Sequence, residues 1–143
     1  MKTFQTHFAE ETTELGRRLA GELKPGSIDL LRGDLGAGKT TMVKGIAEGF
    51  QAAKADEVTS PTFTLIHEYR GPVVTLYHID LYRIDTQREL DTLALDDLMS
   101  PQSILLIEWG EKFPRLARER DVEIAIVSTG ENEREIEVAF KNP

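Results

Sequence analysis

The amino-acid sequence predicts an α/β fold: a mixed β-sheet flanked by helices, with antiparallel hairpins. Three observations support this prediction. Residues 33–40 form a glycine-rich segment between an apolar run and a helix-like run. Residues 103–108 are apolar on both faces, as is typical of a strand inside a parallel sheet. Near the end of the chain, residues 121–128 and 133–140 alternate apolar and polar side chains around a turn-like segment, which indicates a hairpin.

The first part of the chain is expected to contain two strands and two helices. Residues 3–8 alternate weakly, which favours a strand. Leucines at helical spacing predict an amphipathic helix over residues 10–23, and the Pro25-Gly26 pair ends it. An apolar run at residues 28–31 predicts a buried strand that leads into the glycine-rich segment. A helix is expected from there to about residue 51.

The middle of the chain is expected to form a hairpin and short helices. Residues 63–69 and 73–81 read as strands on either side of the turn signal Gly71-Pro72. Residues 87–99 are typical of one or two short helices. Residues 111–120 predict a further short helix that an internal proline makes irregular.

Length and composition limit the class of protein. The 143 residues, with an ordinary apolar fraction, predict one domain over residues 1–143. The absence of cysteine excludes disulfides and thiolate metal sites. Residues 1–10 lack the pattern of a secretory signal, and no apolar run approaches the ~18 residues of a membrane span. We therefore expect a cytoplasmic protein with no membrane partner.

The charge of the chain bears on its partners. The formal net charge is −8, whereas a protein whose main task is to grip nucleic acid is usually basic on at least one face. Direct, tight binding of tRNA or DNA is therefore disfavoured. A basic protein partner stays open, and an acidic surface also serves solubility.

The glycine-rich segment carries the strongest chemical signal. Residues 33–40 match G-x-x-x-x-G-K-[ST], the P-loop that cradles phosphates, at every fixed position. Gly36 and Gly38 let the backbone approach and point N–H groups at phosphate oxygens. Lys39 is expected to reach the β- and γ-phosphates, the Thr40 hydroxyl to bind Mg²⁺, and Thr41 to contact the α-phosphate. The segment thus predicts a nucleoside triphosphate site with magnesium.

A second acid is expected to complete the magnesium site. P-loop proteins place this acid at the end of a neighbouring buried strand. Glu108 follows the cleaner apolar run, and Asp80 follows another predicted strand. We favour Glu108 on the magnesium side and Asp80 near the γ-phosphate, and the reverse assignment stays open.

The nucleobase and the remaining aromatic and histidine side chains are less clearly marked. The chain has no Asn-Lys-x-Asp motif, which guanine-selective P-loop proteins usually use, so ATP is favoured. The sequence leaves open whether Trp109 packs in the core, near the nucleotide or against a partner. His67 and His78 lie in strand patterns and are interpreted as packed or hydrogen-bonded residues, not as catalytic ones, and no zinc site is expected.

Four segments together resemble a known family. Residues 33–41, 60–65, 77–83 and 107–109 occur in an order and at a spacing that closely resemble the bacterial TsaE family, formerly YjeE. The resemblance implies an ATPase with Mg²⁺ that is weak alone and works with a heterodimer of TsaB and TsaD. These proteins make N6-threonylcarbamoyladenosine (t6A) in tRNA, and the ATPase cycle would reset the complex, which leaves tRNA contact indirect.

The resemblance also assigns residues. It implies Lys39, Asp80 and Glu108 as catalytic and Thr40 with Glu108 as the magnesium positions. Residues 60–64 match a loop beside the γ-phosphate that acts as an ATP/ADP switch. The nucleotide-binding positions that it implies are Thr12 (near the adenine), Leu35, Gly36, Ala37, Gly38, Lys39, Thr40, Thr41 and Arg134 of the last hairpin.

Two other functions remain open from the sequence. One is a P-loop kinase for a small molecule or nucleoside, with Asp80 as base and Arg83 or Arg88 as phosphate clamp. The chain lacks an obvious lid with clustered arginines, which argues against a kinase. The other is a nucleotide-dependent scaffold in which ATP orders a docking surface and hydrolysis is incidental.

Overall fold

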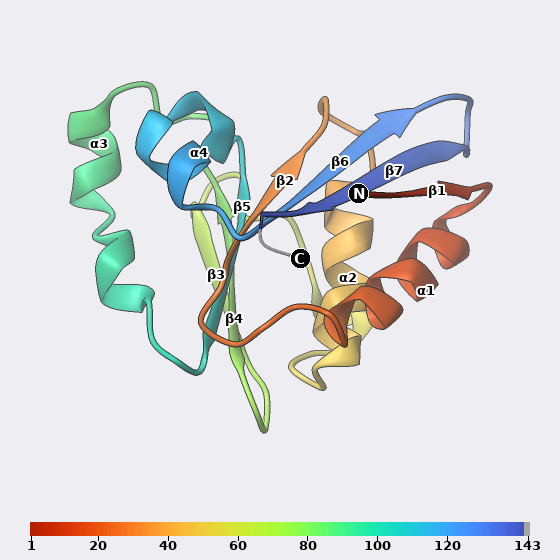
Figure 1. Ribbon diagram of the computed structural model, residues 1–143, viewed down its shortest axis with the longest axis horizontal. Coiled ribbons are helices and arrows are strands. Elements are labelled where there is room, and N and C mark those ends of the chain that lie inside the picture. Colours follow the sequence, from red (N-terminus) through yellow and green to blue (C-terminus); the bar gives the residue numbers. More distant parts are fainter. Residues whose placement is uncertain (142–143) are drawn as a thin grey trace.

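A seven-stranded sheet forms the centre of the molecule (Figure 1). The structure is a computed structural model that describes residues 1–141. The strands run across the sheet in the order β1-β7-β6-β2-β5-β4-β3. Their bounds are β1 Lys2–Thr6, β2 Ile28–Arg32, β3 Ile66–Arg70, β4 Thr75–Asp80, β5 Ser103–Glu108, β6 Val122–Ser128 and β7 Arg134–Phe140.

The sheet is parallel in its centre and antiparallel toward both edges. Strand β2 pairs in parallel with β5 and β6, and β4 pairs in parallel with β5. The hairpins β3–β4 and β6–β7 are antiparallel, as is the pairing of β1 with β7. This arrangement confirms the predicted mixed α/β sheet with hairpins. All six residues of β5 are buried, which explains why the sequence of this strand is apolar on both faces.

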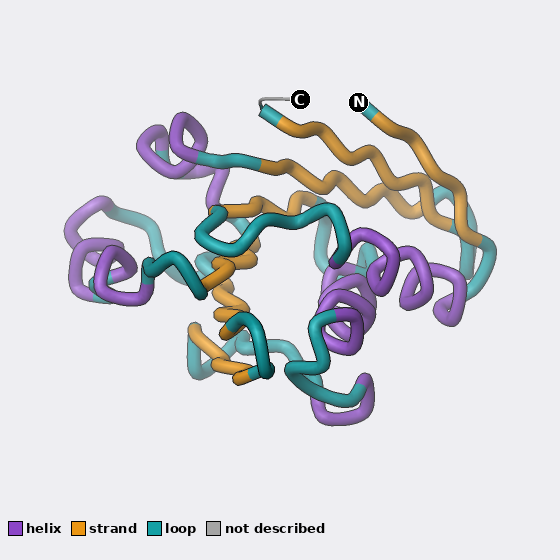
Figure 2. The backbone as a smooth tube through the Cα atoms, turned by 60° about the horizontal axis from the view of Figure 1, so that its bottom comes forward, coloured by secondary structure: helices purple, strands orange, loops and turns teal. Residues whose placement is uncertain are grey.

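Helices cover both faces of the sheet (Figures 1 and 2). One core contains side chains of the sheet together with those of α1 and α2. The other core joins the opposite face to α3, η2 and α4. None of the helices in residues 1–141 is long and apolar enough to cross a bilayer. Their bounds are α1 Ala9–Ala20, α2 Lys39–Gly49, η1 Ala55–Glu57, α3 Gln87–Thr92, η2 Leu95–Leu98, η3 Gly110–Lys112 and α4 Pro114–Glu119.

Helices α1 and α2 touch backbone to backbone. A Cβ atom at Gly45 of α2 would lie 2.0 Å from the carbonyl oxygen of Thr13, and one at Gly16 of α1 would lie 2.6 Å from that of Met42. Only glycine permits such an approach. Because α2 begins directly at the glycine-rich segment, this packing fixes the position of that segment.

The predicted strand over residues 63–69 begins three residues later than expected. Leu65 has φ +70°, and its amide donates to the carbonyl of Pro61 at 2.7 Å, so residues 61–65 turn instead of extending. The Leu65 carbonyl then accepts from the amide of Asp80 at 2.9 Å. The turn therefore lies beside the end of β4.

Candidate functional site

The candidate site lies at the carboxyl ends of the central parallel strands. The pairing register places Glu108, the last residue of β5, beside Leu31 of β2 on one side and Asp80, the last residue of β4, on the other. Strand β2 continues directly into the glycine-rich segment. The register thus brings both acids predicted from the sequence to the edge where the phosphate loop begins.

The loop is shaped to leave backbone amides free. Gly36 has φ +79° and Gly38 φ +108°, conformations that favour glycine. Gly38 is the N-cap of α2 and supplies no capping side chain, so the first amides of the helix keep no capping partner. These N–H groups and the positive end of the helix dipole attract an anion. Residues 33–37 border a cavity of about 310 Å³ that β6 lines on the other side.

Lys39 is buried at the start of α2 and fully engaged. Its ammonium donates to the carbonyl of Gly33 at 2.6 Å and lies 3.5 Å from Glu108 Oε1. It also lies 4.4 Å from the centre of the Trp109 ring, within range of a cation–π contact. A buried ammonium is costly unless it is paired. The side chain is therefore held at the loop by contacts within the protein.

Glu108 has a separate partner for each carboxylate oxygen. Oε1 faces Lys39, and Oε2 lies 2.5 Å from His78 Nε2. Burial by itself raises the pKa of the Glu108 carboxyl, but the hydrogen bond and attraction of His78, with the charge of Lys39, outweigh it and lower the pKa. The carboxylate is thus held ionised at neutral pH.

Asp80 lies next to Glu108 across the β4–β5 pair and is also buried. Its Oδ1 accepts a hydrogen bond from the amide of Tyr82 at 2.9 Å, which fixes the start of the segment after β4. This bond leaves Oδ2 available for a polar ligand at the same edge.

The other predicted nucleotide-binding residues differ in whether they contact the glycine-rich loop. Arg134 reaches it from the last hairpin, because its Nε donates to the carbonyl of Ala37 at 2.7 Å. Thr40 and Thr41 are half-buried in the first turn of α2, and Leu35 is exposed. Thr12 is buried and bonds Thr6 and Phe8 instead of the loop.

The residues at this edge fit a nucleoside triphosphate and a magnesium ion. The uncapped start of α2 and the ammonium of Lys39 offer donors and positive charge to phosphate oxygens. The Thr40 hydroxyl and the Glu108 carboxylate are hard oxygen donors of the kind that Mg²⁺ takes. Residues 1–141 contain no group of three or more His, Cys, Asp or Glu side chains that would hold a metal without help.

Sequence reasoning did not predict the partners of His78 and Trp109. His78 is hydrogen-bonded, which is one of the two interpretations from the sequence, and its partner is Glu108. Trp109 packs edge-to-face on Tyr82 and under Lys39, and its Nε1 is buried without a partner among the described residues. The only sequence signal for Trp109 is its position directly after Glu108. The His78 bond depends on the β4–β5 register, which the sequence does not give.

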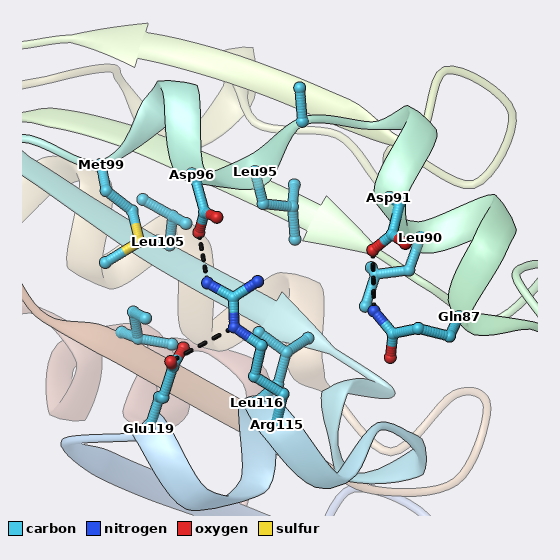
Figure 3. Close-up of a pocket in the computed structure, with 12 residues that line it drawn as sticks. Gln87, Leu90, Asp91, Leu95, Asp96, Met99, Leu105, Arg115, Leu116 and Glu119 are labelled. Carbon is cyan, nitrogen blue, oxygen red and sulfur yellow. Dashed lines mark hydrogen bonds and ion pairs between the residues drawn. The ribbon is translucent and has the colours of Figure 1, made fainter.

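A second cavity lies on the opposite face of the sheet, between α3, η2 and α4 (Figure 3). It measures about 250 Å³, and none of the predicted site residues line it. Its inner wall is apolar, while Arg115 bridges Asp96 at 2.6 Å and Glu119 at 3.2 Å beside it. This cavity lacks the donors and the glycine-rich backbone found at the carboxyl edge.

Known proteins match most of the chain. The family model for threonylcarbamoyl adenosine biosynthesis protein TsaE matches residues 6–136. The tRNA threonylcarbamoyladenosine biosynthesis protein TsaE of Bacillus subtilis is 42% identical over 127 residues, which are 89% of this chain and 78% of that protein. The protein of the same name from Treponema pallidum is 37% identical over 131 residues, 92% of this chain and 95% of its own length.

A solved structure shares the fold. The crystal structure of Bacillus subtilis YdiB superposes with a TM-score of 0.73 and 36% identity, over 99% of this chain and 86% of that one. The resemblance seen in the four sequence segments is confirmed by these matches. The chain belongs to the TsaE family of threonylcarbamoyl adenosine biosynthesis proteins.

Proposed function

We propose that this chain is the ATP-binding and ATP-hydrolysing component of the machinery that makes t6A in tRNA. The observation that carries the proposal is Lys39, held between the Gly33 carbonyl and Glu108 at the uncapped start of α2. An ammonium, free helix amides and a strand-end carboxylate are the parts that phosphoryl chemistry on a P-loop requires. The family and the names of its relatives supply the pathway.

The phosphate cradle assigns a role to each of its residues. The amides of residues 35, 36 and 38–41 bind phosphate oxygens, while that of Ala37 donates to the Asp34 carbonyl. Lys39 exchanges part of its contact with Glu108 for the β- and γ-phosphates. Thr40 and Glu108 would hold the magnesium ion, which neutralises charge that develops on the phosphates. Asp80 orients a water or an oxygen at the γ-phosphate. Arg134 fixes the loop through the Ala37 carbonyl.

Partner proteins are part of the proposal. Leu35 and Phe63 are apolar but exposed, and both belong to segments at the carboxyl edge. Apolar side chains left in water around a site often mark a surface that another protein covers. We assign this surface to a TsaB–TsaD heterodimer in the cytoplasm, and we expect turnover by the chain alone to be slow. With a net charge of −8, the chain leaves tRNA to its partners.

The test is ATP turnover by the purified chain, with and without the TsaB–TsaD heterodimer and tRNA. The proposal expects slow turnover alone and clear stimulation by the heterodimer. Lys39→Ala should show no turnover in either condition, which controls for contaminating ATPase. Robust phosphorylation of a free nucleoside without stimulation would instead identify a kinase. Wild-type modification rates by a Glu108→Gln chain would identify a scaffold.

A further inference from the structure

His78 is a wholly buried histidine on β4. Its Nε2 lies 2.5 Å from Glu108 Oε2, and because an ionised carboxylate can only accept, Nε2 carries the proton. The Nδ1 atom is buried and has no partner among residues 1–141. An unpaired buried nitrogen lowers stability, so an aliphatic side chain would fill this space at less cost. An aliphatic side chain, however, would not provide the hydrogen bond to Glu108.

The sheet register sets the direction of this bond. His78 lies opposite Leu106, two residues before the pair formed by Asp80 and Glu108, so His78 and Glu108 share one face of the sheet. Diagonal neighbours across a strand pair are within reach of long side chains. The imidazole binds Glu108 Oε2, so Glu108 Oε1 points toward Lys39, with 3.5 Å between Oε1 and the Lys39 ammonium.

We propose that His78 is a positioning residue, whose Nε2–H fixes Glu108 Oε2 and thereby presents Oε1 to the phosphate loop. The inference rests on the proposed function, because it takes Glu108 as the magnesium-side acid. Carboxylates that bind metals are themselves oriented by hydrogen bonds, and loss of such a bond typically weakens metal affinity 10–100-fold. Without His78, both oxygens of Glu108 are free to turn toward Lys39, in competition with the metal.

Two amide substitutions separate positioning from packing. The side-chain amide of His78→Gln reaches the place of Nε2 and keeps a donor for Glu108, whereas that of His78→Asn ends near Nδ1 and does not. We expect the magnesium concentration for half-maximal ATP binding to rise about 10- to 100-fold in His78→Asn and much less in His78→Gln. ATP affinity measured in EDTA should stay the same in both. Calorimetric titration measures these values.

Nuclear magnetic resonance gives a readout that needs no nucleotide. The protein has three histidines, so His7 and His67 serve as internal references. The Nε2 proton of His78 is expected to exchange slowly and to shift in Glu108→Gln, while the signals of the other two histidines stay in place. A His78 proton that exchanges freely, or that ignores Glu108→Gln, contradicts the inference.

The outcomes distinguish this inference from the proposed function. Equal loss of magnesium response in both variants, or wild-type response in His78→Asn, overturns the role of His78 alone. If ATP binding by the wild-type chain does not depend on magnesium, the proposed function is overturned. The proposed role of the His78 bond is then overturned as well. Selective loss in His78→Asn, with the expected His78 signal, supports both.

Discussion

Each end of the central strands buries an acid on the face covered by α1 and α2. The surroundings shift the pKa values of these two acids in opposite directions. At the carboxyl end, Glu108 is bonded by His78 and faces Lys39, and its pKa is lowered. At the amino end, Asp29 of β2 has only the Ser27 hydroxyl, at 3.0 Å from Oδ2, and its Oδ1 has no partner among the described residues. Burial raises the pKa of Asp29 to about 7, against the hydrogen bond from Ser27 and with the repulsion of Asp121.

The comparison shows that burial by itself does not decide the charge of an acid. Both side chains are almost inaccessible to water, yet Glu108 is held as a carboxylate and Asp29 holds its proton up to neutral pH. The difference comes from the cations and N–H donors that surround each carboxyl group. The paired charges around Glu108 suit a charged ligand, whereas Asp29 offers no paired charge at the amino end.

The largest effect is expected from Lys39→Ala. The substitution removes the ammonium from the phosphate loop and one partner of Glu108, so ATP affinity should fall about 100-fold or more. Calorimetric titration with ATP measures the change. Lys44→Ala is the matched control, because Lys44 lies in the same helix but donates to the carbonyls of Ala55 and Val58, away from residues 33–40. Equal ATP affinity of the Lys39→Ala and wild-type chains would show that the carboxyl end is not the phosphate site.

The second effect concerns the acid of the carboxyl end. Glu108→Gln keeps the size of the side chain but removes its charge, so magnesium-dependent turnover should fall about 100-fold while ATP binding in EDTA persists. A steady-state ATPase assay with the partner proteins measures this. Asp29→Asn, at the other end of β2, should leave turnover unchanged. Loss of turnover in Asp80→Asn but not in Glu108→Gln would mean that the two acids have exchanged roles.

The third effect is a pH dependence of stability at the amino end. Because the folded pKa of Asp29 lies above its usual value of 3.8, the folded state binds more protons, and the free energy of unfolding falls as pH rises from about 4 to about 7. The full penalty above that range is about 4 kcal/mol. Asp29→Asn resembles the protonated acid, so it should be more stable than the wild type at pH 8, and this advantage should be clearly smaller at pH 5.

Urea denaturation at these two pH values measures the difference. Asp56→Asn, an exposed acid on η1, is the control and should not alter the pH profile. Parallel pH profiles for the Asp29→Asn and wild-type chains would show that Asp29 is ionised in the folded protein and that the two ends do not differ.

The smallest effect is expected from Ser27→Ala. The hydroxyl is the one side-chain donor to Asp29 within residues 1–141, and its loss should cost about 1 kcal/mol of stability. The loss should be greater at pH 8 than at pH 5, because the bond is stronger to the ionised carboxyl. Denaturation curves of the single variant at both pH values measure this, and an equal loss at both would mean that the bond does not depend on the charge of Asp29.

The sequence predicted the carboxyl end far better than the amino end. Glycine spacing predicted a phosphate loop at residues 33–40. Strand-end positions predicted that Asp80 and Glu108 lie together beside it, because parallel strands bring their carboxyl ends to one edge. The bonds of His78 and Arg134 could not be predicted in the same way. The first depends on strand register, and the second joins residues 97 positions apart in the chain. Asp29 lies inside an apolar run, where nothing in the sequence distinguishes a buried acid from an exposed one.

The measurement that most directly tests the contrast between the two ends is a titration of the isotopically labelled chain with ATP and magnesium, followed by backbone amide chemical shifts. We expect large shifts in residues 33–41 and at Asp80, Glu108 and Trp109, and none at Ser27 or Asp29. Shifts concentrated at the amino end, or in the cavity between α3 and α4, would contradict the account.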